Sequence, residues 1–206
     1  MLVSINRELG WGWVLDRYLF RIPEEFGGAL YGAEFGAAYG GTVATAASAW
    51  RGRGTIWGFD TFNGHPGHLV HAALPARDNE ANTMNTHYAK HGTEGLSVDY
   101  QRAELARMEL PNAILVPGLI HADSCRAAGV PKLHYAHLDL DILESMETAY
   151  ANVLPLLVPG GYLILHDVYN FPRLRDWLRN QIIPGGLWGI DLESPVTLYC
   201  VLKRKA

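Results

Sequence analysis

The sequence has few of the residues that mark several protein classes. Its two cysteines, Cys125 and Cys200, are far apart and in no ligand spacing, which argues against a disulfide framework or a zinc site and fits reduced thiols in a cytoplasmic protein. Charged residues make up 18% and the net charge is −4, so no basic surface indicates nucleic-acid binding. No run reaches the ~20 apolar residues of a membrane helix, and residues 1–10 lack the form of a signal peptide.

The remaining composition is that of a globular protein. Hydrophobic residues make up 49% of the 206 positions, which is enough for one domain with a full core. We expect a single domain over residues 1–206, in which residues 1–28 form a helical addition that packs on the domain or on a partner subunit. Expected strands are at residues 29–35, 55–59, 113–116, 133–138, 162–165, 187–192 and 196–202, and expected helices at residues 11–26, 40–50, 96–110, 144–157 and 171–183.

The most informative stretch is residues 133–170. An apolar run ends in Asp139 and Asp141, a helix-period segment follows, residues 158–161 break the chain, and a second apolar run ends in His166 and Asp167. Strand, helix and strand in this order form a crossover unit with parallel strands. Because the carboxyl ends of parallel strands line the ligand crevice of an open sheet, we expect these four side chains to converge.

Glycines follow the first expected strand. Glu34 and Gly36 lie where this strand ends, and Gly40, Gly41 and Thr42 open an alanine-rich helix. A glycine lets a ligand approach the backbone, although a tight turn without any ligand would need it equally. The pattern is not the G-x-G-x-x-G of dinucleotide-binding proteins, and an acid here suits a cationic or hydroxyl-bearing ligand better than a pyrophosphate.

The second expected strand ends in Asp60, an acid well placed for the two hydroxyls of a ribose, or else a turn or cap residue. Residues 61–95 follow, and we interpret them as a lid or substrate-binding loop. This segment holds five of the nine histidines, at positions 65, 68, 71, 87 and 91. Metal binding by the first three would need a helix, which Pro66 and Gly67 disfavour, so a substrate contact by His65 is the preferred interpretation.

The last two expected strands are joined by Glu193, Ser194 and Pro195 alone, so they must pair antiparallel. The predicted fold is therefore α/β: a doubly wound, seven-stranded sheet with one reversed strand. This topology, with Glu-x-Gly after the first strand and Asp after the second, resembles the class I S-adenosylmethionine-dependent methyltransferases, which are Rossmann-like. The ordered motifs AEFGAAYGGT, WGFDTFNGHPG, VPGLIHADS, HLDLDILES and PGGYLILHDVYN resemble the TylF/MycF-type sugar O-methyltransferases over residues 29–172.

The resemblance implies a role for each motif. Glu34 and Gly36 would hold the methionine part of S-adenosylmethionine, Asp60 its ribose, and residues 118–124 would lie beside the adenine. The candidate cofactor-binding residues are Glu34, Gly36, Thr42, Asp60, Gly118, His121 and Asp139. In the family the first acid of L-D-x-D binds magnesium and the second acts as the base, which falls on Asp139 and Asp141. The metal site would be completed by His166 and Asp167.

Two positions depart from the family pattern: His166 replaces an aspartate and Leu143 a tyrosine. Magnesium prefers oxygen ligands, and an imidazole moves the preference toward transition metals or zinc. Alternatively no metal binds, and His166 is the base. Asp141, for its part, would be either the base or a cap on the following helix.

The sequence thus predicts a metal-assisted O-methyltransferase acting on a hydroxyl of a small molecule, a sugar or another diol, as in natural-product modification. A nicotinamide-dependent oxidoreductase is disfavoured by the missing G-x-G-x-x-G. A cofactor-binding protein without catalysis is the other alternative, because of His166. We expect neither nucleic-acid nor membrane partners, and a homodimer would suit Trp11 and Trp13 in the first helix.

Overall fold

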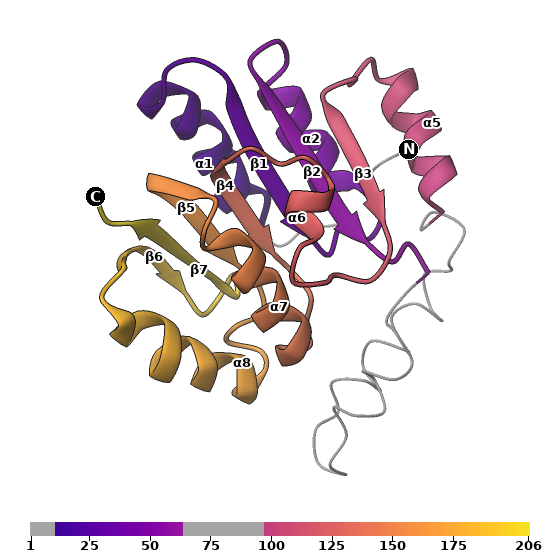
Figure 1. Cartoon of the computed structure of the whole chain (residues 1–206). Helices are drawn as coiled ribbons and strands as arrows, with labels where there is room; N and C mark the ends of the chain where they lie inside the picture. The colour runs from indigo at the N-terminus through magenta and orange to yellow at the C-terminus, as the bar shows by residue number, and fades with distance from the viewer. Residues whose placement is uncertain (1–10, 64–96) are drawn as a thin grey trace.

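The computed structural model describes residues 11–63 and 97–206, with side chains from Val14 onward (Figure 1). Seven strands form one sheet in the order β3-β2-β1-β4-β5-β7-β6. The strands are β1 (Leu30–Phe35), β2 (Gly54–Asp60), β3 (Ala113–Pro117), β4 (Leu133–Leu138), β5 (Leu157–Leu165), β6 (Trp188–Ser194) and β7 (Tyr199–Arg204). β1 to β5 pair in parallel, and β7 lies antiparallel to both β5 and β6. The predicted doubly wound sheet with one reversed strand is confirmed.

Helices cover both faces of the sheet (Figure 1). They are α1 (Trp11–Glu25), α2 (Gly41–Ala49), α5 (Val98–Arg107), α6 (Ser124–Ala127), α7 (Leu143–Val153) and α8 (Pro172–Trp177), followed by a π-turn, Leu178–Ile182, and a 3-10 turn, Ile183–Gly185. Leu105 of α5 is buried with residues of α1 and α2 on one face, and Cys125 of α6 with residues of α7 and α8 on the other. No helix in the described part of the chain is long and apolar enough to cross a membrane.

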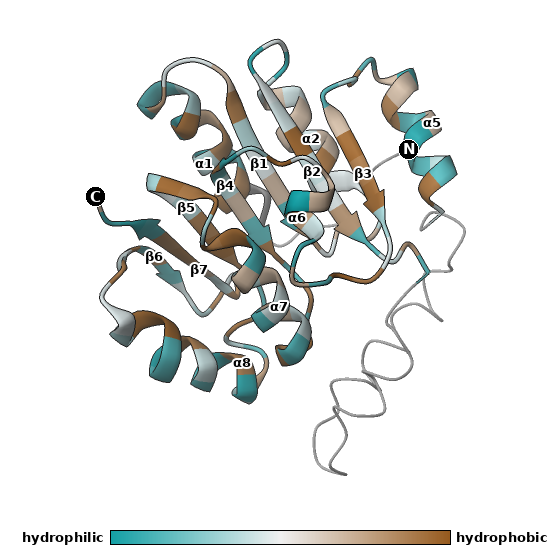
Figure 2. Ribbon diagram, viewed as in Figure 1, coloured by the Kyte–Doolittle hydropathy of each residue, from teal (hydrophilic) through white to brown (hydrophobic). Residues whose placement is uncertain are grey.

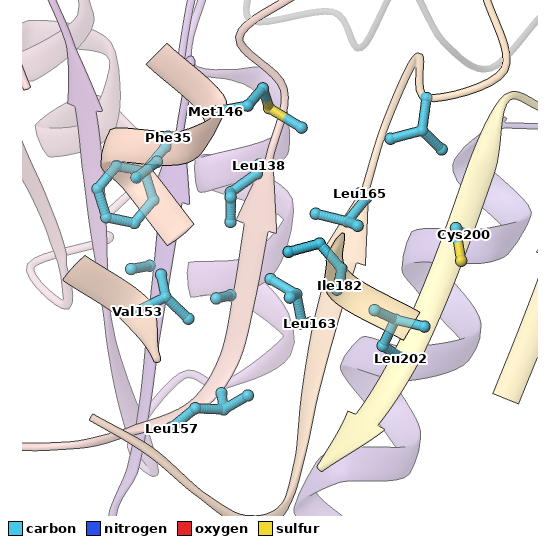
Figure 3. Packing of buried hydrophobic residues seen from close by; sticks show 14 of the residues in the cluster. Phe35, Leu138, Met146, Val153, Leu157, Leu163, Leu165, Ile182, Cys200 and Leu202 are labelled. Atoms are coloured by element: carbon cyan, nitrogen blue, oxygen red, sulfur yellow. The ribbon is translucent and has the colours of Figure 1, made fainter. Parts of the chain in front are cut away.

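The core is divided by the sheet because successive strand residues point to opposite faces. Leu138, Leu163 and Leu165 pack beneath α7 and α8, and Figure 3 shows them with Met146 and Val153 of α7. In Figure 2 the helices show the complementary pattern, with hydrophilic and hydrophobic segments side by side along α5 and α8.

α1 packs on its own domain. Tyr18, Leu19 and Ile22 are fully or almost fully buried, and the indole of Trp50, at the end of α2, donates to the carbonyl of Leu19 at 2.8 Å. The helix is therefore an integral layer of the fold. The side chains of Trp11 and Trp13, which were considered for a subunit contact, lie outside the described residues.

Two local expectations were wrong. Residues 158–161 do not separate helix from strand: α7 ends at Val153, and β5 begins at Leu157 and runs through them. The β4–β5 register passes from Leu133↔Leu157 to Tyr135↔Tyr162, so a bulge in β5 absorbs the extra residues, with Gly160 at φ +78°. The expected helix over residues 171–183 is interrupted, because its second half is a π-turn and a 3-10 turn.

Candidate active site

The carboxyl ends of four neighbouring strands meet at one edge of the sheet. Their backbones stay paired past the strand ends: the amide of Asp139 donates to Phe35 O at 2.8 Å, and the amide of His166 donates to Leu138 O at 3.0 Å. This pairing brings together Asp139, Asp141, His166 and Asp167, the convergence that the sequence predicts.

A left-handed residue follows each of these strands. Ala38 after β1, Phe62 after β2, Asp141 after β4 and Asp167 after β5 have φ values between 43° and 63°. Such backbone is uncommon for residues other than glycine, and it is held only where the surrounding structure fixes it. Four such turns at one edge of a sheet mark it as the candidate functional edge.

The centre of the site is a cluster of one imidazole and two carboxylates. Nδ1 of His166 lies 2.8 Å from Asp139 Oδ1 and 3.2 Å from Asp167 Oδ2. Burial lowers the pKa of His166, but the charges and hydrogen bonds of the two carboxylates outweigh it, so the pKa lies well above its ordinary value. The imidazole therefore lies between two carboxylates that compensate its charge.

This cluster fits a metal ion. One potential ligand atom from each of Asp139, His166 and Asp167 lies within 4.8 Å of the other two, which is close enough for a shared cation. Two carboxylate oxygens and one imidazole nitrogen form a mixed donor set, which suits manganese, iron, cobalt, nickel or zinc better than magnesium.

Asp141 lies beside this cluster. Burial first, and then the negative charges of Asp139 and Asp167, raise its pKa well above the ordinary range of an aspartate. The N-cap of α7 is Ile142, so the alternative in which Asp141 caps this helix is not what the structure has. A carboxylate with a raised pKa is a stronger base than an exposed aspartate.

Glu34 is buried at the end of β1, with 1% of its surface exposed. Its Oε1 accepts a hydrogen bond from the hydroxyl of Thr42, and within the described residues its Oε2 has no hydrogen-bond partner. A buried carboxylate oxygen without a donor is costly, so it is expected to receive one from a ligand or a water molecule.

His137 and Tyr199 extend this buried polar row and were not predicted. His137 Nδ1 lies 3.6 Å from Glu34 Oε1, and the rings of Tyr199 and His166 are 4.5 Å apart. Both residues are fully buried, and their polar side-chain atoms have no hydrogen-bond partner in the described part of the chain. His137 could be identified only from the register between β1 and β4, which pairs it with Glu34. Tyr199 reaches the site only because β7 returns antiparallel beside β5.

Asp60 has two backbone partners. Its Oδ2 accepts from the amide of Ala38 at 2.9 Å and its Oδ1 from the amide of Phe62 at 2.8 Å. The turn role considered from the sequence is therefore present. It leaves further lone pairs for a ligand, since a carboxylate can accept about four hydrogen bonds.

The loop after β3 contains Gly118, at φ +133°, whose amide donates to Asp60 O at 2.9 Å. His121 is exposed, and its amide donates to Ser124 Oγ at 2.8 Å. The amide contact places Gly118 next to the end of β2, and the adenine contact expected of residues 118–124 stays a prediction. The histidines at positions 65, 68, 71, 87 and 91 lie outside the described residues.

Neither a protein-family model nor a curated protein matches the sequence. Among solved structures, the O-methyltransferase NovP superposes with a TM-score of 0.73 at 18% identity, over 99% of this chain and 81% of NovP. CalS11, a TDP-rhamnose 3'-O-methyltransferase of calicheamicin biosynthesis, has a TM-score of 0.57 at 19% identity over 93% of this chain and 77% of its own. A protein from Staphylococcus aureus, described as a caffeoyl-CoA O-methyltransferase, has a TM-score of 0.61 at 13% identity, over 94% of this chain and 83% of its own. The chain has the class I methyltransferase fold that these proteins share.

Proposed function

We propose that this protein is an S-adenosylmethionine-dependent O-methyltransferase of the TylF/MycF type, acting with a divalent metal on a hydroxyl of a sugar or another diol. The observation that carries the proposal is the cluster of Asp139, His166 and Asp167, with Asp141 beside it, at the carboxyl edge of this fold. The motif resemblance and the fold shared with NovP and CalS11 support it.

The cofactor would lie across the ends of β1, β2 and β3. The Oε2 of Glu34, which has no hydrogen-bond partner among the described residues, would accept from the amino group of the methionine part, next to the backbone of Gly36. Thr42 would hold the other oxygen of Glu34. Asp60 would receive the ribose hydroxyls, and the loop with Gly118 and His121 would flank the adenine. The cofactor supplies an electrophilic methyl group on a sulfonium.

Asp141 would act as the general base. As the acceptor oxygen forms its bond to the methyl carbon, the bond from that carbon to sulfur breaks, and the hydroxyl proton passes to the Asp141 carboxylate. The raised pKa of Asp141 favours this transfer, because a carboxylate with a higher pKa binds the transferred proton more strongly.

Asp139, His166 and Asp167 would hold the metal. A bound divalent cation lowers the pKa of a hydroxyl that it coordinates and orients vicinal oxygens. The second candidate needs no metal: His166, whose Nδ1 lies between Asp139 and Asp167, would accept the proton itself from its neutral form.

The acceptor class is proposed from the neighbours and from the chemistry. CalS11 is a sugar 3'-O-methyltransferase and NovP an O-methyltransferase, so a saccharide or glycosylated natural product is the first choice. A diol also suits the mixed acid and imidazole cluster, since two adjacent oxygens chelate one cation. We propose further that the acceptor is a small molecule, that the protein has no nucleic-acid or membrane partner, and that it forms a homodimer.

Asp141→Asn is the decisive variant. Asparagine tolerates the left-handed backbone at this position but does not act as a base, so we expect turnover to fall by about 10²–10⁴-fold. S-adenosylhomocysteine affinity, measured by calorimetry, should stay near the wild-type value. The matched control is Asp176→Asn, an exposed aspartate on α8. Turnover within a few-fold of wild type in Asp141→Asn would remove Asp141 as the base, and wild-type protein that binds no S-adenosylhomocysteine would contradict the methyltransferase proposal.

A further inference from the structure

Two buried amide side chains donate hydrogen bonds to the backbone of two loops at the functional edge. Gln101 on α5 is fully buried, and Asn152 on α7 is 3% exposed. They belong to helices on opposite faces of the sheet and lie in none of the motifs discussed above. Long polar side chains are seldom fully buried, so each needs a specific reason for its place.

Gln101 holds the loop after β1. Its Nε2 donates to the carbonyl of Ala38 at 2.5 Å, while the amide of Ala38 donates to Asp60 Oδ2 at 2.9 Å. Both polar groups of this left-handed residue are therefore fixed by side chains. Gly40, at φ +72°, makes the approach possible, because a Cβ there would lie 2.5 Å from Gln101 Oε1.

Asn152 holds the loop after β3 in the same way. Its Nδ2 donates to the carbonyl of His121 at 2.6 Å and to Thr148 O at 3.0 Å, and its Oδ1 accepts from the amide of Cys125 at 3.1 Å. One side chain thus connects α7, the start of α6 and the exposed turn before it.

We propose that Gln101 and Asn152 are positioning residues that shape the cofactor cradle. They keep the loop after β1 and the loop after β3 in their ligand-ready conformations from opposite faces of the sheet. The inference rests on the proposed function, in which these two loops contact the methionine part, the ribose and the adenine. Pre-formed loops save the cofactor the entropy of ordering them, so their loosening weakens binding.

The chain supplies a matched control in Asn112. Its Nδ2 also bridges two carbonyls, Ala47 O at 2.8 Å and Gly54 O at 3.0 Å, but at the start of β2, the opposite edge of the sheet. Loss of this amide should lower stability without loosening the functional edge.

The test compares Gln101→Met, Asn152→Leu and Asn112→Leu in the full-length chain. Affinity for S-adenosylhomocysteine is measured by calorimetry per folded molecule, and amide hydrogen exchange of residues 35–43 and 119–125 is followed without ligand. We expect about tenfold weaker binding in the first two variants and wild-type affinity in the third. Exchange should accelerate at 35–43 in Gln101→Met alone and at 119–125 in Asn152→Leu alone. Steady-state kinetics should show a raised KM for S-adenosylmethionine with kcat within a few-fold.

Gln101→Glu and Asn152→Asp keep the size and polarity of the side chain but lose the donated hydrogen bond. If the apolar variants do not fold, the same measurements are made on these two variants. The proposal would be overturned if the Gln101 and Asn152 variants bound S-adenosylhomocysteine within twofold of wild type. Equal losses of affinity in these variants and in Asn112→Leu would also overturn it. If wild-type protein binds no S-adenosylhomocysteine, the proposed function fails and the cofactor role of the amides with it. The exchange data still decide, separately, whether the amides hold the loops.

Discussion

Gly36 has no room for a side chain. Its φ is +93°, and a Cβ would lie 1.8 Å from the carbonyl oxygen of Asp139, where the ends of β1 and β4 meet. We expect Gly36→Ala to lower the free energy of unfolding by about 2–4 kcal/mol, because strain and a backbone clash add. Chemical denaturation measures this loss.

Gly52→Ala separates the two causes. Gly52 has a φ of +74°, but beyond its chain neighbours no atom of the described residues lies within 4 Å of its hypothetical Cβ. Only the backbone strain therefore applies, and we expect a loss of about 1 kcal/mol. Equal losses in the two variants would mean that the contact with Asp139 is unimportant.

His166 is expected to set the choice of metal. In His166→Asp the imidazole becomes a third carboxylate beside Asp139 and Asp167, so the preference should move toward magnesium. We expect the ratio of manganese to magnesium affinity to fall by about tenfold in calorimetric titrations of chelator-treated protein. Asp139→Ala, which removes a ligand in either case, should bind both ions poorly. An unchanged ratio would contradict a metal contact by His166.

Residue patterns predicted part of this site and missed the rest. Asp139, Asp141, His166 and Asp167 follow apolar strands of one crossover unit, so their convergence follows from parallel pairing alone. His137 reads as one more residue of a buried strand, and its contact with Glu34 depends on the register between β1 and β4. Register is a tertiary property that no local pattern contains.

At the level of elements, α1 is fastened to the reversed end of the sheet by Glu25. Its carboxylate accepts from the Tyr162 hydroxyl at 2.8 Å, from Lys203 at 2.7 Å and from Arg21 at 2.5 Å. Burial raises the pKa of Glu25, but these hydrogen bonds outweigh it and the net shift is downward. The charged form is therefore favoured in the native state.

Glu25→Gln should cost about 1 kcal/mol at pH 7, because the group is partly exposed and its ion pairs are screened. With a pKa that is lower in the folded than in the unfolded protein, this stabilisation is present above the unfolded value near 4.5 and is lost as the pH falls through the folded value. Denaturation of both proteins between pH 3 and 7 checks the sign. Glu24→Gln, an exposed neighbour, is the control, and a difference that does not shrink in acid would exclude the ionic origin.

Element types were predictable and element ends less so. The apolar runs and glycine-rich turns located all seven strands. The bulge in β5 was missed, because Pro159, Gly160 and Gly161 read as a chain break whether or not the neighbouring strand accommodates them. The π-turn after α8 likewise leaves the helical spacing of its apolar residues intact, so the pattern carried no sign of it.

For the whole molecule, the directions of the strands follow from a few rules. Alternating strands and helices require parallel crossovers, and the short link after β6 requires an antiparallel return. The observed directions agree with this reasoning, whereas the order β3-β2-β1-β4-β5-β7-β6 was not predicted. Burial of α1 against the sheet depended instead on the long-range contacts of Tyr18 and Glu25, whose partners are about 140 to 170 positions away in sequence.

The direction of the reversed strand β7 also determines which end of it is suitable for attaching a dye, a surface or a fusion partner. β7 starts with Tyr199 beside the functional edge and carries the chain back across the sheet, so Arg204 pairs with Trp188 at the opposite edge. A surface, dye or fusion partner joined after Ala206 would therefore face away from the strand ends that hold Asp139 and Asp141. Attachment at Ala206 would therefore leave the functional edge turned toward the solution.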